Sequence, residues 1–235
     1  MLAKFTKKNN YLFNLFLFLY VIFGLYLSIN TGITTDELLD QFNWSLSLEA
    51  IKDFFGANNN GYVNLYAYIW KFHGIGFHYF SQFYISFLEI FIKFEYLPDE
   101  ISRILLNHSL VFLTFFTSGI IARKILYLLI KDKIYSNVFL VFYLFYPYLL
   151  GHGFYNPKDM PFLFAWILCT YLSIKIFIKI YKKEDVTFLY IFFIAISTSF
   201  LLSIRISGIL ISIQYLIGFF ITSNLIKLSI FKSFK

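Results

Sequence analysis

Long apolar runs are the feature that most limits what this chain can fold into. A helix needs roughly 20 predominantly apolar residues to cross a bilayer, and the sequence holds several runs of about this length between short charged segments. The runs cover residues 11–28, 104–122, 134–150, 160–178, 186–204 and 206–226. They predict an all-α integral membrane protein, a polytopic bundle of about six transmembrane helices that forms a single domain over residues 1–235.

Composition supports this class and excludes others. The 235 residues are 59% hydrophobic and 14% charged, whereas soluble domains are about 45–50% apolar and about 25% charged. A water-soluble fold could not bury so much apolar surface, and the same figures exclude a disordered chain, a coiled coil and a disulfide scaffold. The net charge of +7 is expected to reflect cytoplasmic Lys and Arg rather than a nucleic-acid partner.

The positions of the charges predict the orientation of the chain. With a cytoplasmic N-terminus, the inner segments are residues 1–10, 123–133, 175–185 and 227–235, and they hold 14 of the 20 Lys and Arg residues. The outer segments hold 10 of the 13 acids. Because cytoplasmic loops carry an excess of Lys and Arg, both termini are predicted to be cytoplasmic.

The outer loop at residues 29–103 is unusually long and acidic. Residues 32–56 have an amphipathic helical pattern that ends before the turn-forming residues 58–60. Residues 81–94 are apolar enough for a seventh span, but Glu89 and Lys93 at i,i+4 spacing suit an amphipathic helix at the membrane interface. A seventh span would also place the later Lys clusters outside. The loop is therefore expected to contain amphipathic juxtamembrane helices.

Acidic residues next to the span ends are the first candidates for chemistry. Asp36 and Glu37 closely follow the first span, and Asp159 precedes the fourth, so all three are expected on the outer face. Thr34 and Glu37 have capping-box spacing, and Asn156 can cap the fourth span, so helix capping is one explanation. A shared site that binds a divalent cation or acts as a general base is the other. The spacing leaves both open.

Basic residues accompany these acids. Lys158 stands beside Asp159 with His152 nearby, and ionisable residues at a membrane boundary are functional candidates. Arg205 falls in the turn between the last two spans, where it either snorkels to the interface or binds a phosphate group. The other histidines show no metal-ligand spacing and are expected to be structural: His73, His78 and His108.

The order of these motifs resembles that of GT-C-type membrane glycosyltransferases, in particular the superfamily of protein O-mannosyltransferases and lipid A aminoarabinose transferases. An acidic motif follows the first span, as at residues 34–38, and an Arg opens the second, as Arg103 does. Residues 156–162 (NPKDMPF) resemble a subgroup of small bacterial members, and residues 205–208 match a basic residue before a Gly-containing turn. The resemblance implies a GT-C-like bundle and corresponds to the N-terminal half of such proteins, so a truncated member is expected.

The resemblance also implies a role for each candidate residue. Asp36 would be the catalytic base or lie beside a metal, with Glu37 supporting it. Asp159, together with Asp36, would hold a divalent cation, Mg or Mn. The residues facing the phosphate of the lipid donor would be Arg205, Lys158 and His152.

The function implied is transfer of a hexosyl or pentosyl group from a polyprenyl-phosphate donor to an acceptor hydroxyl at the outer membrane face. The acceptor would be a lipid, a glycan or a protein, and the membrane a bacterial inner membrane. The alternative is a non-catalytic polytopic membrane protein, either a transporter subunit or an assembly scaffold. Transporters usually carry ionisable residues near the bilayer midplane, whereas these residues lie at span ends. Convergence of Asp36 and Asp159 on one cleft would favour the enzyme over the scaffold.

Overall fold

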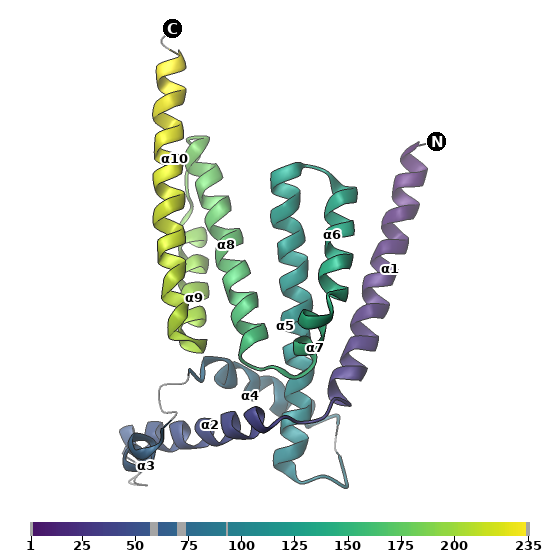
Figure 1. Cartoon of the computed structure of the whole chain (residues 1–235), viewed down its shortest axis with the longest axis vertical. Helices are drawn as coiled ribbons and strands as arrows, with labels where there is room; N and C mark the ends of the chain where they lie inside the picture. Colours follow the sequence, from purple (N-terminus) through teal and green to yellow (C-terminus); the bar gives the residue numbers. More distant parts are fainter. Residues whose placement is uncertain (1, 57–60, 70–73, 93, 234–235) are drawn as a thin grey trace.

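The computed structural model describes residues 2–56, 61–69, 74–92 and 94–233. These residues form helices joined by short connections, and no strand occurs among them. The prediction of an all-α fold is therefore confirmed. The long helices run side by side, and shorter helices of the 29–103 loop lie across one end of the bundle (Figure 1). We call this the loop end; α1 begins and α10 ends at the opposite end.

Four helical segments in the described part of the chain are long and apolar enough to cross a membrane. They are Tyr11–Ile29 within α1 (Leu2–Ile29), α5 (Asp99–Ile130), α8 (Asp159–Tyr181) and Ile206–Lys227, which combines the 3-10 helix η1 (Ile206–Leu210) with most of α10 (Ile211–Ser233). A fifth results if α6 (Lys133–Phe145) and α7 (Pro147–Tyr155) count as one bent span. The apolar helix α9 (Phe188–Ile204) has 17 residues and is shorter than each of these four segments.

The sequence predicted one straight helix for the run at residues 134–150, but the structure has two helices there. The run breaks at Tyr146, which has an extended backbone with φ −65° and ψ 115°, and α6 and α7 meet at an angle of 61°. Pro147 explains the break, because proline has no N–H to donate and disfavours the helical conformation of the residue before it. Pro147 then occupies the first turn of α7, where its missing N–H is tolerated.

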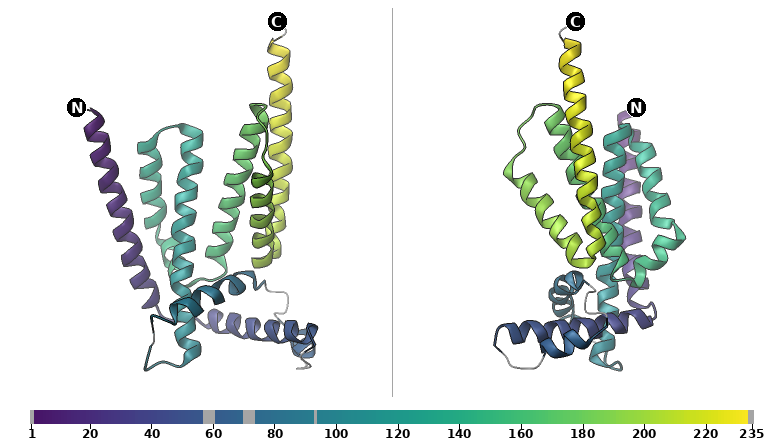
Figure 2. Two further views of the ribbon diagram at one scale, coloured as in Figure 1. Left: turned by 180° about the vertical axis from the view of Figure 1, so that it is seen from behind. Right: turned by 60° about the vertical axis from the view of Figure 1, so that its left-hand side comes forward.

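Three short helices form the layer at the loop end: α2 (Thr35–Phe54), α3 (Gly61–Ala67) and α4 (Gly76–Leu88). Both views in Figure 2 show α2 and α4 lying across the bundle below α8, α9 and α10, while the start of α5 extends past them. With 13 residues, α4 is too short to span a bilayer. Glu89 at its end pairs with Arg103 at 2.6 Å, while its expected partner Lys93 and the predicted turn at residues 58–60 lie outside the described residues.

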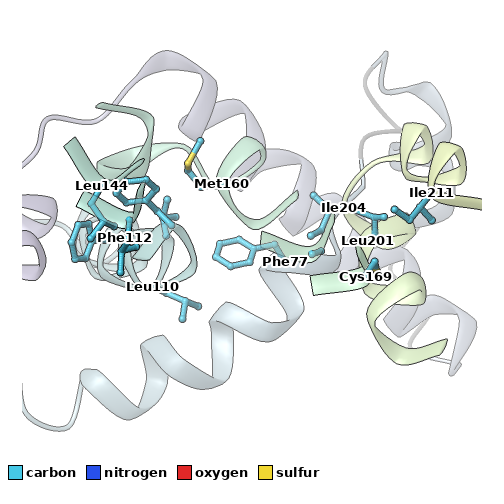
Figure 3. Close-up of a cluster of buried hydrophobic side chains, with 13 residues drawn as sticks. Phe77, Leu110, Phe112, Leu144, Met160, Cys169, Leu201, Ile204 and Ile211 are labelled. Carbon is cyan, nitrogen blue, oxygen red and sulfur yellow. The ribbon is translucent and has the colours of Figure 1, made fainter. Parts of the chain in front are cut away.

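The hydrophobic core centres on α5 and fastens the loop layer to the bundle. Phe112 stacks on Phe154 of α7 with ring centroids 5.8 Å apart, and Gly24 of α1 lies so close to the Phe112 ring that a side chain there would overlap it. Phe77 of α4 is 2% exposed and lies between the core residues around Phe112 and those around Leu201 (Figure 3). The position of α4 is therefore fixed by burial of an aromatic side chain.

Candidate functional site

A cleft of about 260 Å³ opens at the loop end, where the start of α2 meets the start of α8 and the end of α9. Five of the six candidate residues line it: Asp36, Glu37, Lys158, Asp159 and Arg205. Asp36 and Asp159, which are far apart in sequence, thus share one cleft. His152 is not among the lining residues.

The start of α2 is organised by the predicted capping box. Thr34 is the N-cap residue in an extended conformation, and its backbone N–H donates to Glu37 Oε1 at 2.9 Å. The Thr34 hydroxyl donates to the same oxygen at 2.7 Å. Glu37 is only 4% exposed. Capping therefore explains one oxygen of this carboxylate.

The second oxygen of Glu37 contacts a histidine within α5. Glu37 Oε2 pairs with His108 Nε2, while His108 Nδ1 lies 3.1 Å from the carbonyl oxygen of Ser28 at the end of α1. Because the carbonyl oxygen of Ser28 can only accept a hydrogen bond, Nδ1–H is the donor in this contact. The pair is almost fully buried. It joins α1, α2 and α5 directly behind the cleft.

Asp36 differs from its neighbour because its side chain is exposed to the cleft. Within the described part of the chain, no hydrogen bond or ion pair engages its carboxylate. Asp40, one helical turn further on, lines the same cleft but is buried and forms an ion pair with Lys158 Nζ. The sequence analysis missed Asp40, although its i,i+4 spacing from Asp36 places both on one helix face.

Asn156 organises the turn before α8, although it is not the N-cap residue that the capping interpretation expected, because that position is taken by Lys158. Asn156 Oδ1 accepts the backbone N–H groups of Lys158 at 3.1 Å and Asp159 at 2.8 Å. Its Nδ2 donates to Asp159 Oδ2 and to His152 Nδ1, both at 2.9 Å. The helix begins at Asp159, and the His152 ring lies 4.5 Å from that of Tyr148. His152 thus supports Asn156 from behind rather than facing the cleft.

Arg205 is held at the cleft by the backbone break that follows α9. Its φ of −150° and ψ of 133° are extended and end the helix. The guanidinium Nη2 lies 2.6 Å from Asp159 Oδ1, and the group sits 5.9 Å from the centre of the Phe162 ring. The side chain is 43% exposed. Arg205 therefore keeps donor groups accessible to a ligand while one of them pairs with Asp159.

His78 of α4 is buried near the cleft and stacks on Trp44, with ring centroids 6.2 Å apart. Burial lowers the pKa of His78 to about 4, and the positive charge of Lys158 lowers it in the same direction. His78 is therefore neutral at neutral pH. It adds no charge to the pairs between Lys158 and Asp40 or between Arg205 and Asp159.

The acids of the cleft do not fit a metal centre as they are arranged. Among the residues that the structure describes, no group of three or more His, Cys, Asp and Glu side chains could hold a metal ion. The two oxygens of Asp159 are bonded to Arg205 and Asn156, and Asp40 is paired with Lys158. Mg²⁺ is usually held by one or two carboxylates together with waters and substrate oxygens, so Asp159 would have to exchange a present partner for the ion. The expected Mg or Mn stays a prediction, and no step below depends on it.

The apolar bundle and its charged cleft define the chain as a helical membrane protein with a polar site at one end of its helices. The chain matches no protein-family model, and no match is found among curated proteins or solved structures. Its resemblance to GT-C-type transferases therefore depends on its own residues alone.

Proposed function

We propose that this protein is a GT-C-type glycosyltransferase that moves a sugar from a polyprenyl-phosphate donor to an acceptor hydroxyl. One observation carries the proposal: the cleft combines an exposed carboxylate, Asp36, which has no bonding partner among the described residues, with two cations, Lys158 and Arg205. Lys158, Asp159 and Arg205, which line the cleft, stand at the start of α8 and directly after α9, where these apolar helices end. A lipid phosphate requires this location, because its chain stays in the bilayer while its charged group meets the cations.

In the proposed reaction, the oxygen of an acceptor hydroxyl attacks the anomeric carbon of the sugar. The bond between that carbon and the phosphate oxygen breaks, and Asp36 accepts the proton of the hydroxyl. The lipid phosphate leaves with the bonding electrons and with increased negative charge. Arg205 and Lys158 would stabilise this charge through their N–H donors.

The proposal includes a topology of six spans with the cleft on the outer face. In it, the bent pair α6 and α7 forms the third span, and α9 crosses the membrane despite its 17 residues. The distribution of Lys and Arg supports cytoplasmic termini. The same proposal includes a bacterial inner membrane as the location, a polyprenyl-phosphate sugar as the donor and a lipid, glycan or protein as the acceptor. The enzyme would be a hexosyl or pentosyl transferase.

The non-catalytic alternative has less support from the same observations. A scaffold requires no convergence of Asp36 and Asp159, yet both line one cleft. A transporter is expected to carry its ionisable residues near the midplane of the bilayer. The cleft residues instead gather at the ends of α8 and α9 and at the start of α2.

The experiment that tests the proposal is the Asp36→Asn variant of the full chain in lipid nanodiscs. Transfer from radiolabelled polyprenyl-phosphate hexose and pentose donors to lipid, glycan and protein acceptors is measured. Loss of a general base is expected to lower transfer by at least about 100-fold. The thermal midpoint is expected to be unchanged, because Asp36 makes no bond with any residue that the structure describes. Asp99→Asn, another acid in the first turn of a helix, is the matched control. Near-normal transfer by Asp36→Asn would remove the assignment.

A further inference from the structure

Tyr68 lines the cleft, and its hydroxyl group is buried without a hydrogen-bond partner among the described residues. The residue directly follows α3, and its backbone N–H donates to the carbonyl of Leu65 at 3.1 Å. Its ring meets that of Phe42 edge-on, with centroids 5.4 Å apart and an angle of 78° between the planes. These contacts fix the position of the ring, while the hydroxyl, although buried, forms no hydrogen bond among the described residues.

Buried hydroxyl groups are almost always hydrogen-bonded, so an unpaired one in a cleft indicates a place that a ligand completes. Each cation of the cleft already pairs with one acid, Lys158 with Asp40 and Arg205 with Asp159, although Arg205 keeps further donor groups accessible. Asp36 resembles Tyr68 in having no bond within the part of the chain that the structure describes. The two groups are complementary, because a carboxylate only accepts hydrogen bonds whereas a phenol also donates them.

We propose that Tyr68 is a substrate-binding residue that donates its O–H to a ligand hydroxyl held beside Asp36. A hydroxyl group accepts from Tyr68 and donates to Asp36 at the same time. A phosphate oxygen also accepts from Tyr68, but the Asp36 carboxylate repels it. The ligand class is thus a polyhydroxylated one, a sugar. This inference rests on the proposed function, and the hydroxyl belongs either to the sugar of the donor or to the acceptor.

The test is Tyr68→Phe in the full chain in nanodiscs, with binding measured by calorimetry. The probes are farnesyl phosphate, farnesyl-phosphoryl mannose or arabinose, and the free methyl glycosides of the same sugars. Tyr96→Phe is the matched control, since Tyr96 is 96% exposed and does not line the cleft. Loss of one hydrogen bond is expected to weaken binding about 5-fold.

The probes distinguish the two sources of the hydroxyl. If it belongs to the donor, Tyr68→Phe weakens binding of the farnesyl-phosphoryl sugar and leaves that of farnesyl phosphate unchanged. If it belongs to the acceptor, only the free glycoside is affected. The thermal midpoint of the variant is expected to equal or exceed that of the wild type, because the variant removes an unpaired buried hydroxyl.

Two results overturn the assignment of Tyr68: wild-type affinity of Tyr68→Phe for every sugar probe, or an equal loss for farnesyl phosphate. A lowered thermal midpoint with unchanged affinities assigns Tyr68 a structural role instead. These results leave the proposed function intact, because the wild-type chain still binds the probes. If the wild-type chain binds none of them, the proposed function fails together with this inference.

Discussion

Arg205 Nη2 and Asp159 Oδ1 lie 2.6 Å apart, joining the break after α9 to the first residue of α8. The two side chains are 43% and 39% exposed. Exposed ion pairs typically contribute about 0–1 kcal/mol to stability. A phosphate group that binds Arg205 in place of Asp159 therefore replaces only a weak interaction.

The first prediction concerns this competition. Arg205→Gln is expected to weaken farnesyl phosphate binding by about 10-fold or more, because a charge-assisted hydrogen bond is lost. Its unfolding free energy should change by less than about 1 kcal/mol, as expected for an exposed pair. Calorimetry in nanodiscs measures the affinity, and thermal unfolding measures the stability.

Lys182→Gln is the control for general attraction between the chain and an anionic lipid. Lys182 follows α8 at the end opposite the cleft, and its side chain is 60% exposed. The Lys182→Gln variant should bind farnesyl phosphate as the wild type does. If Arg205→Gln and Lys182→Gln weaken binding equally, Arg205 has no specific role in phosphate binding.

The second prediction concerns the buried pair of Glu37 and His108. Removal of one partner of such a pair costs about 3–5 kcal/mol, because the other is left unpaired. We expect Glu37→Ala and His108→Ala each to destabilise the chain by several kcal/mol, and the double variant to lose clearly less than the sum of the two. Unfolding in mixed detergent micelles measures all four proteins of this cycle.

Glu37→Gln separates the capping role of Glu37 from its charge. Glutamine also completes a capping box, so the bond with the Thr34 N–H survives while the contact between the carboxylate and His108 is lost. The free energy of unfolding of Glu37→Gln should therefore lie between those of the wild type and Glu37→Ala. Additive losses in the double variant would instead mean that Glu37 and His108 stabilise the chain independently.

The sequence could predict those parts of the fold and site that depend on local pattern. Long apolar runs predicted α1, α5 and α8, since the bilayer sets the length and hydropathy of a span. The spacing of Thr34 and Glu37 predicted a helix start because capping involves neighbours only. The sequence could not predict that His108 is the second partner of Glu37, because the two residues are 71 positions apart and meet only in the folded chain.

The pairing of charges also depended on tertiary packing. Lys158 has Asp159 as its sequence neighbour, yet it pairs with Asp40 of α2, and Asp159 pairs with Arg205. His108 was expected to be merely structural, although a polar residue within an apolar span is a recognisable signal. Tyr68 carried no signal at all, because the aromatic residues of this chain are too abundant for one to stand out.

The third prediction concerns the pH dependence that His78 produces. Its pKa is about 4 in the folded chain and about 6.5 when unfolded, so the unfolded chain binds the extra proton between these values. The stabilisation is complete above about pH 6.5 and is lost as the pH falls toward 4. The loss amounts to about 3 kcal/mol at most. Thermal unfolding from pH 7.5 to 4 measures it.

His78→Phe keeps an aromatic ring against Trp44 and cannot be protonated. The difference between wild type and His78→Phe isolates the contribution of His78 from that of all other titrating groups. This difference should change by about 3 kcal/mol between pH 7 and pH 4 in favour of the variant. Parallel pH profiles would show that His78 does not resist protonation in the folded chain.

The last prediction concerns the close contact that holds α3, and with it Tyr68, against α2. A Cβ atom at Gly61 would overlap the backbone of Glu49 and Ala50. Because backbone atoms cannot rotate aside as a side chain does, Gly61→Ala is expected to shift α3 and to cost about 1–3 kcal/mol, the usual range for overpacking. Gly151→Ala is the matched control, since a Cβ at this helical position meets no atom within 4 Å. It should leave stability unchanged or raise it by up to about 1 kcal/mol.

Since Tyr68 lies directly after α3, Gly61→Ala should also weaken binding of the sugar probes while leaving farnesyl phosphate binding unchanged. Equal stabilities and affinities of Gly61→Ala and Gly151→Ala would contradict the packing of α3 on α2.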